Sequence, residues 1–238
     1  MGGFVAILTD DLYAMFRSVT VWSWLVITAL GSAAAVVVAA AFTDTTSFIL
    51  GWGLTLYLGL GSFVIIVLSA NAASGELGYL GDAIMSRGLT PVQYISAKLL
   101  SRLVTVQAMF LLVVPAAALG MLWKGTNDDI QITGMILGLT YVALFLALLV
   151  CLGVMLSSFI PNILLAVALL VIIWYIAMGI YVMFESNGFT PEGVLGELPG
   201  ILRGSFEMAE NWPVMLLMIF LMAVLSGLSI LSFHLRDL

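Results

Sequence analysis

The sequence predicts an all-α integral membrane protein, formed by a single domain over 1–238, in which six helices cross the bilayer. Hydrophobic residues make up 63% of the chain and charged residues only 8%, against about 25% charged residues in soluble domains. The apolar residues also fall into six runs, each close to the roughly 20 residues that a helix needs to cross a bilayer. We expect the spans at 19–42, 48–73, 103–123, 132–156, 163–184 and 214–233.

The first 18 residues predict a helix that lies in the membrane interface. Apolar residues recur at helical spacing while Asp10 and Arg17 fall opposite, which is typical of an amphipathic surface helix. A frayed tail with chance periodicity is the alternative. Asp10 and Asp11 stand where a secretory signal would be basic, so we expect no cleaved signal. The predicted apolar face consists of Phe4, Ile7, Leu8, Leu12, Met15, Phe16 and Val19.

The lysines and arginines predict that both termini lie in the cytoplasm. With the N-terminus inside, Lys124 and Arg203 are the two of the seven basic residues that fall outside. This agrees with the enrichment of basic residues in cytoplasmic loops. We therefore expect a multi-pass protein of the plasma (inner) membrane. The basic residues expected on the cytoplasmic side are Arg17, Arg87, Lys98, Arg102 and Arg236.

The polar stretch at 74–102, between the second and third spans, predicts a short cytoplasmic helix. Ser74 can cap this helix and Glu76 lies in its first turn, where a negative charge is favourable. Gly88 is placed to end it. Leu77, Leu80 and Ile84 share one face, and Arg87 falls in the last turn.

A second helix is predicted to begin directly afterwards. Thr90 and Gln93 form a capping box around Pro91 at the first helical position. The helix should continue as the third span, with Lys98 and Arg102 one turn apart near its cytoplasmic end. We expect Glu76 to pair with these two cations; a solvated glutamate at a helix start is the alternative.

The chemistry of the spans excludes several functions. None carries Asp, Glu, Lys or Arg in its interior, whereas ion-coupled carriers need such groups inside the membrane. The chain has no P-loop and no metal-ligand pattern, and its seven basic residues are too few for nucleic-acid binding. We therefore expect no catalytic residue, cofactor or metal. The energy for any transport must come from a partner, and the cytoplasmic segment is the natural place for it to dock.

The external connection at 185–213 predicts short helices that line an exit from the spans. Glycines at 193, 196 and 200 interrupt its apolar residues, and five glutamates lie on the same side of the membrane. A solvated acidic loop is the alternative. The apolar face consists of Val194, Leu195, Leu198, Ile201, Leu202 and Phe206.

The cytoplasmic segment resembles the signature region of ABC-2-type transporter permeases, the membrane subunits of ATP-binding-cassette systems with the type V fold. It departs from that signature at Tyr79, Gly88 and Pro91, where the family usually has threonine, proline and arginine. The resemblance extends to the architecture: an interfacial N-terminal helix, six spans, a coupling helix between spans two and three, and an external segment before span six. The matching residues are Glu76, Gly78-Tyr79-Leu80, Gly88-Leu89-Thr90-Pro91 and Ala97-Lys98-Leu99-Leu100.

The resemblance implies a non-catalytic permease subunit of an exporter, embedded in membrane lipids. It would pair with a second copy or a paralogue, and cytoplasmic ATP-binding-cassette ATPases would press on the coupling helices. A non-transporting membrane anchor or assembly subunit of a larger complex is the main alternative, and a secondary carrier is the third. The residues expected to couple the ATPase are Glu76, Leu77, Leu80, Ile84, Arg87, Pro91, Lys98 and Arg102.

Overall fold

The described part of the chain is helical and contains no strand. The computed structural model describes residues 2–41, 46–72, 90–125, 129–184, 197–205 and 208–236. The helices are α1 (Gly2–Phe16), α2 (Val19–Ala41), α3 (Thr46–Ala70), α5 (Pro91–Lys124), α6 (Ile132–Phe159), α7 (Ile163–Phe184), α9 (Leu198–Leu202) and α10 (Met208–Arg236).

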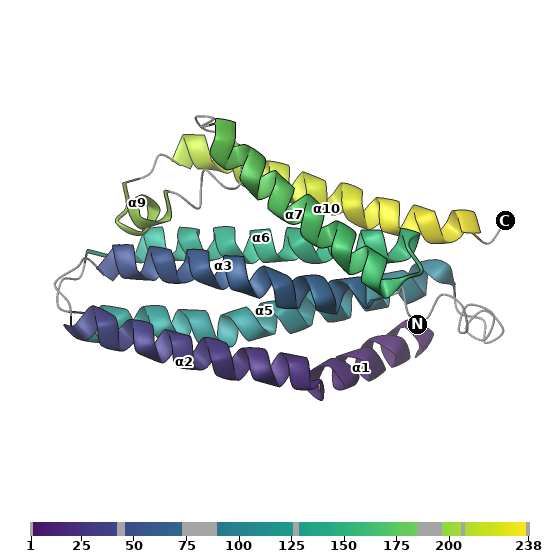
Figure 1. The fold of residues 1–238 in the computed structure, drawn as a ribbon, viewed down its shortest axis with the longest axis horizontal. Helices are drawn as coiled ribbons and strands as arrows, with labels where there is room; N and C mark the ends of the chain where they lie inside the picture. Colours follow the sequence, from purple (N-terminus) through teal and green to yellow (C-terminus); the bar gives the residue numbers. More distant parts are fainter. Residues whose placement is uncertain are drawn as a thin grey trace.

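The long helices lie side by side in an elongated bundle (Figure 1). Its interior is formed by α3 and α6, in which 56% of the most apolar stretch is buried, compared with 17% in α2 and α10. α6 packs against α3, α5, α7, α9 and α10, while α2 packs against α3 and α5. α2 and α10 therefore have more exposed surface than α3 and α6.

Five helices are long and apolar enough to cross a membrane: α2, α3, α5, α6 and α10. The predicted all-α architecture is thus confirmed in the described residues, and the long apolar helices are compatible with the predicted membrane protein. The predicted span at 163–184 corresponds to α7, whose fully described stretch, Ile163–Ile176, is a shorter apolar helix. The sixth crossing therefore stays a prediction.

The helix that contains the third predicted span begins where the sequence indicates. Pro91 is the first residue of α5, and Thr90 accepts a hydrogen bond from the backbone N–H of Gln93 at 3.3 Å. The backbone N–H of Thr90 in turn donates to the Gln93 side chain at 3.4 Å, which completes the predicted capping box. α5 then runs for 34 residues through Pro115. The predicted cytoplasmic helix at 75–88 lies outside the described residues.

Small residues let two elements approach α6 closely. A Cβ at Gly134 would overlap the backbone carbonyl of Ile201 in α9, and one at Gly153 would overlap the Ser69 side chain of α3. Gln107 joins α5 to α6, because its side-chain amide donates to the Ala143 carbonyl at 2.8 Å. These contacts agree with the packing roles expected for glycines and lone amides in membrane spans.

The N-terminal helix is present as α1. Ile7 and Met15 are half-buried against the bundle. Phe16 and Val19 belong to the same predicted apolar face and are 40% and 80% exposed. The chain turns at Arg17 and Ser18, so Val19 is the first residue of α2 and not part of α1 (Figure 1). The placement of α1 in the membrane interface stays a prediction.

The connection predicted to be external contains one described helix, α9, which packs into the bundle. Leu198, Ile201 and Leu202 are all buried, against α3 and α6. The backbone N–H of Gln131 donates to the Leu202 carbonyl at 2.9 Å and so fixes α9 to the start of α6. The other residues of the predicted apolar face, at 194, 195 and 206, lie outside the described residues.

Candidate functional site

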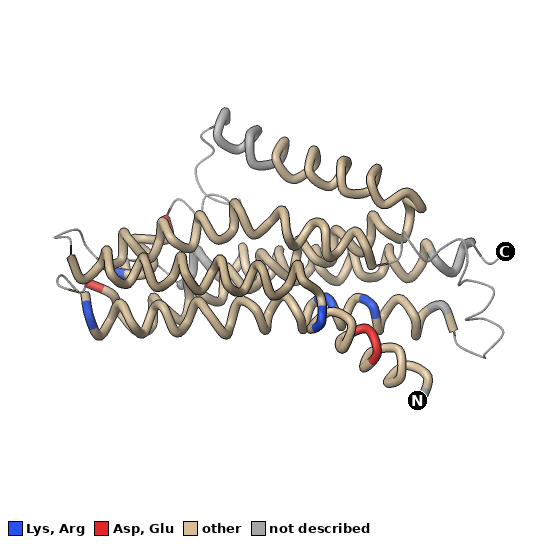
Figure 2. The backbone as a smooth tube through the Cα atoms, turned by 60° about the horizontal axis from the view of Figure 1, so that its bottom comes forward, with Lys and Arg blue, Asp and Glu red and all other residues tan. Residues whose placement is uncertain are grey.

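The charged residues of the described chain gather at the two ends of the bundle, with an uncharged stretch between them (Figure 2). One end contains a buried cluster formed by α1 and α5. Lys98 donates to Oδ1 of Asp11 at 2.9 Å, and both Arg102 and the Ser101 hydroxyl donate to Oδ2. The side chains of Asp11 and Arg102 are only 8% and 3% exposed. This cluster is the candidate functional site.

Local sequence places each member of the cluster. Asp11 lies one helical turn from both Ile7 and Met15, so the stripe that packs α1 on the bundle also carries the carboxylate inward. Lys98 and Arg102 are likewise one turn apart in α5.

Arg102 connects the cluster to a third helix. Its Nε donates to the backbone carbonyl of Leu68 at 3.0 Å. Leu68 lies in the last turn of α3, where carbonyls have no partner within the helix. A single guanidinium thus joins α1, α3 and α5 at the base of the predicted cytoplasmic segment.

The electrostatics of the cluster favour an ionised Asp11. Burial alone would raise the pKa of this carboxyl, but the charge of Arg102, the hydrogen bond from Ser101 and the contact with Lys98 outweigh burial. The pKa of Asp11 is therefore held below its usual value of 3.8. Asp11 is therefore ionised at neutral pH and forms ion pairs with Lys98 and Arg102.

The structure describes three of the eight predicted coupling residues. Lys98 and Arg102 meet in the cluster, and Pro91 opens α5. The pairing of Glu76 with the two cations stays a prediction, because Glu76 lies outside the described residues. The predicted residues outside the described part are Glu76, Leu77, Leu80, Ile84 and Arg87.

Asp11 was not predicted from the sequence as the partner of the two cations. It is separated from Lys98 by 87 positions in the chain, and no local pattern reports a contact at that distance. The available signal was its place in the apolar stripe of α1, between Ile7 and Met15. A carboxylate at such a position needs a buried partner.

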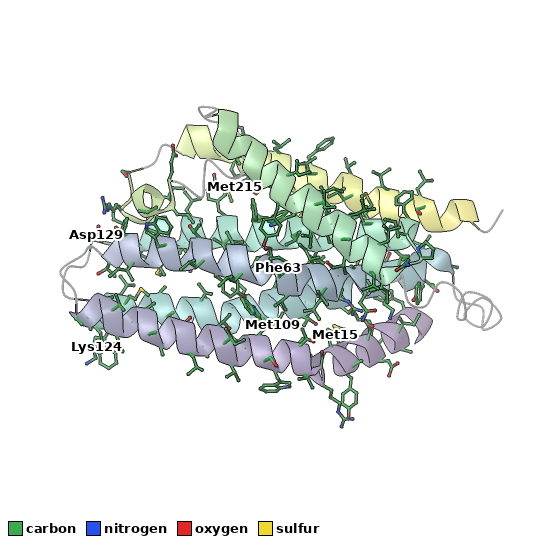
Figure 3. The ribbon with its side chains drawn as sticks, viewed as in Figure 1. Met15, Phe63, Met109, Lys124, Asp129 and Met215 are labelled. Atoms are coloured by element: carbon green, nitrogen blue, oxygen red, sulfur yellow. The ribbon has the colours of Figure 1, made fainter. Side chains whose placement is uncertain are left out.

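A second polar cluster lies at the other end of the bundle, where Figure 3 labels Asp129 and Lys124. Oδ1 of Asp129 accepts the Ser47 backbone N–H at 2.8 Å, and Oδ2 accepts its hydroxyl at 2.6 Å. Arg203, just after α9, donates to Oδ2 of Asp129 at 2.7 Å. Burial would raise the pKa of Asp129, but the two bonds from Ser47 and the bond and charge of Arg203 lower it below 3.8.

In the described part of the chain, both clusters join helices of the bundle to one another. Within that part of the chain no group of three His, Cys, Asp or Glu side chains could hold a metal ion. Cys151, the one cysteine of the sequence, is buried in α6.

No protein-family model matches the chain, and a search of curated proteins finds no significant match.

Proposed function

We propose that the chain is the permease subunit of an ATP-driven ABC exporter. It would pair with a second copy or a paralogue and couple hydrolysis in a partner ATPase to movement of the spans. In this proposal α7 is the sixth crossing, both termini are cytoplasmic, and residues 75–93 are the docking segment. The observation that supports it most is α5, a single helix that begins at Pro91, within the last residues of that segment, and runs through the bundle.

α5 is long and is joined to other helices at its start, so it could transmit a movement along the bundle. Its 34 residues correspond to about 51 Å at 1.5 Å per residue. Its start is joined to α1 by the Asp11 cluster and to α3 by the bond from Arg102 to Leu68. Further along, it packs against α2, α6 and α10. A push on residues 75–93 would move α1 and the end of α3 with α5, and would reach the remaining spans through it.

The experiment that tests this proposal is co-purification with a cytoplasmic ATPase. Leu80→Glu combined with Ile84→Glu should abolish recovery of the ATPase while the protein still inserts into the membrane. Val5→Glu is a suitable control, because Val5 is 53% exposed on α1 and lies outside the docking segment. This control should recover the ATPase at wild-type yield.

The same experiment addresses the alternative of an anchor or assembly subunit. Such a subunit would be recovered with other membrane proteins and without an ATPase. Wild-type recovery of the ATPase by the doubly substituted protein would place docking elsewhere and would contradict the role of 75–93.

A further inference from the structure

Arg17, at the turn between α1 and α2, has no carboxylate partner in the described part of the chain. Lys98 and Arg102 share Asp11, whereas Arg17 is exposed and lies outside that cluster. Its guanidinium lies over the ring of Tyr13, 4.2 Å from the ring centroid. Such stacking orients the guanidinium plane and leaves the N–H groups at its edge able to bind an anion. The proposed function does not account for this exposed cation.

The surface next to the guanidinium is apolar and exposed. Phe16, Val19 and Trp22 are 40%, 80% and 58% exposed. The Trp22 indole N–H donates to the Phe16 carbonyl at 2.8 Å, which fixes the indole at the turn. Val26 and Leu30 are 55% and 67% exposed and continue the face of Val19 and Trp22 along α2. A cation at the start of an apolar stripe suits an amphiphile with an anionic headgroup.

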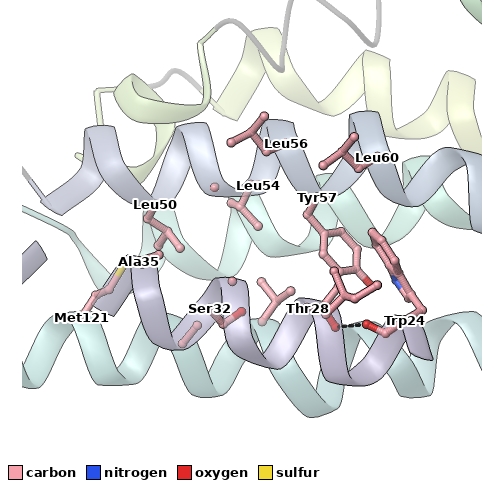
Figure 4. A pocket seen from close by; sticks show the side chains of 15 residues that line it. Trp24, Thr28, Ser32, Ala35, Leu50, Leu54, Leu56, Tyr57, Leu60 and Met121 are labelled. Carbon is pink, nitrogen blue, oxygen red and sulfur yellow. Dashed lines mark hydrogen bonds between the residues drawn. The ribbon is translucent and has the colours of Figure 1, made fainter. Parts of the chain in front are cut away.

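α2 and α5 run side by side in the same direction, so the levels of their residues along the bundle can be compared. Both helices start at the end that carries the buried cluster (Figure 1). A Cβ at Gly120 of α5 would lie 3.2 Å from Val36 of α2. Ala35 and Met121, from the same two helices, lie toward one end of the pocket that Figure 4 shows, and Trp24 lies toward the other. Val36 and Gly120 are therefore at the same level.

Two exposed tryptophans on these helices are separated by about the thickness of a hydrocarbon core. Trp22, near the start of α2, is 58% exposed, and Trp123, near the end of α5, is 83% exposed. Counted through Val36 and Gly120, they are about 26 Å apart along the bundle at 1.5 Å per residue. The hydrocarbon core is about 30 Å thick, and tryptophan is enriched at both of its boundaries. In a bilayer, Trp22 would thus mark one boundary, with Arg17 on its headgroup side.

We propose that Arg17, together with Tyr13 and Trp22, binds the headgroup of an anionic phospholipid. The guanidinium donates to the phosphate oxygens, and one acyl chain lies on the stripe that begins at Val19. The choline of a zwitterionic lipid would bring a positive charge close to Arg17, whereas phosphatidylglycerol leaves the phosphate charge unbalanced. A free phosphate would make no use of the stripe. The inference requires that α2 crosses a bilayer, but it does not rest on ATP-driven transport.

The test is native mass spectrometry of the protein in detergent with equal amounts of phosphatidylglycerol and phosphatidylcholine. The wild type should retain phosphatidylglycerol in excess. Arg17→Gln should lower the ratio of bound phosphatidylglycerol to phosphatidylcholine about fivefold, which corresponds to about 1 kcal/mol for one basic residue at the membrane surface. Arg17→Lys keeps the charge but loses the planar fork, so it should lower the ratio less. Arg17 is exposed, so both variants should unfold at the wild-type temperature.

Lys124→Gln is the matched control. It also removes an exposed cation that lies over an aromatic ring, 5.0 Å from the centroid of Trp123. An ammonium has no planar fork for phosphate, so this variant should lower the ratio less than Arg17→Gln does. Equal losses in the two variants would show that net charge alone sets the ratio and would overturn the proposal.

Two other occupants of this surface would also contradict the proposal. Excess glycerol phosphate, which has no acyl chain, should not displace the bound lipid, and displacement would show a site for free phosphate. A dimer that Arg17→Gln separates into monomers would show that the surface contacts a second protein copy in place of lipid.

Discussion

The two ends of the bundle carry the same three kinds of side chain in different surroundings. At one end Asp11 meets Arg102 and Ser101; at the other Asp129 meets Arg203 and Ser47. Asp11 and Arg102 are 8% and 3% exposed, whereas Asp129 and Arg203 are 24% and 45% exposed. The two ends are therefore stabilised by different interactions, although the residue types match.

Burial decides what each ion pair contributes. A charge left unpaired at the Asp11 end cannot be solvated, so the cluster must stay complete for α1 to remain on α5. At the Asp129 end water can replace a lost partner, so the ion pair itself contributes little. That end is held mainly by the close packing of α9 on α6, at Gly134.

Breaking the Asp11 cluster should give the largest effect. Asp11→Asn leaves Lys98 and Arg102 buried without this carboxylate and should destabilise the bundle by about 3–5 kcal/mol. The measurement is thermal unfolding in detergent, monitored by a thiol-reactive dye that reaches the buried Cys151 only when the bundle opens. Asp10→Asn, at an exposed neighbouring position, should leave the transition unchanged.

The stabilisation by Asp11 should also depend on pH. Because folding lowers the pKa of Asp11, its contribution is fully present above the unfolded value of about 3.9 and is lost as the pH falls through the lower folded value. The wild type should thus keep this stabilisation at neutral pH, and its advantage over Asp11→Asn should shrink only in strong acid. An advantage that vanished near pH 6 would contradict the assignment.

Displacing α9 should give an intermediate effect. Gly134→Val forces a side chain into the backbone of Ile201 and should cost about 1–3 kcal/mol. Gly59→Val also places valine in a helix, but a Cβ at Gly59 would meet no atom within 4 Å. The same dye assay compares the two variants. Equal stabilities would show that helix propensity, and not the fit of α9, accounts for the change.

Removing the charge at the exposed end should give the smallest effect. Asp129→Asn keeps an oxygen that can accept from Ser47 but loses the ion pair with Arg203, which is 45% exposed. We expect a loss of about 0.2–1 kcal/mol. Added salt should narrow the gap between wild type and variant, because screening weakens exposed pairs. A loss as large as that of Asp11→Asn would contradict the comparison of the two ends.

Local features of the fold could be predicted from the sequence. The long apolar helices follow from hydropathy, and the start of α5 follows from Thr90, Pro91 and Gln93, because a capping box involves residues only three positions apart. The close approach at Gly134 and Gly153 could be predicted only in general terms. Small residues in a span permit close helix contact, but they do not say which helix makes it.

The partners within the candidate site could not be predicted. Asp11 and Lys98 are 87 positions apart, and Asp129 and Arg203 are 74 apart. Pairing at such separations is decided by how whole helices pack, which short-range periodicity does not report. The turn at Arg17 and Ser18 was also not predicted, and it places Val19 in α2 instead of α1.

The hydrogen bond from Arg102 to the Leu68 carbonyl also affects the conformational entropy of the chain between these two residues. Leu68 lies shortly before residues 73–89 and Arg102 shortly after them, so folding holds together the two places where the chain enters and leaves that segment. The entropy of closing this loop is therefore already lost before any molecule binds there. Lengthening the connection between two fixed points costs only about 0.6 kcal/mol per doubling, so insertions within 73–89 should cost less stability than the loss of Arg102.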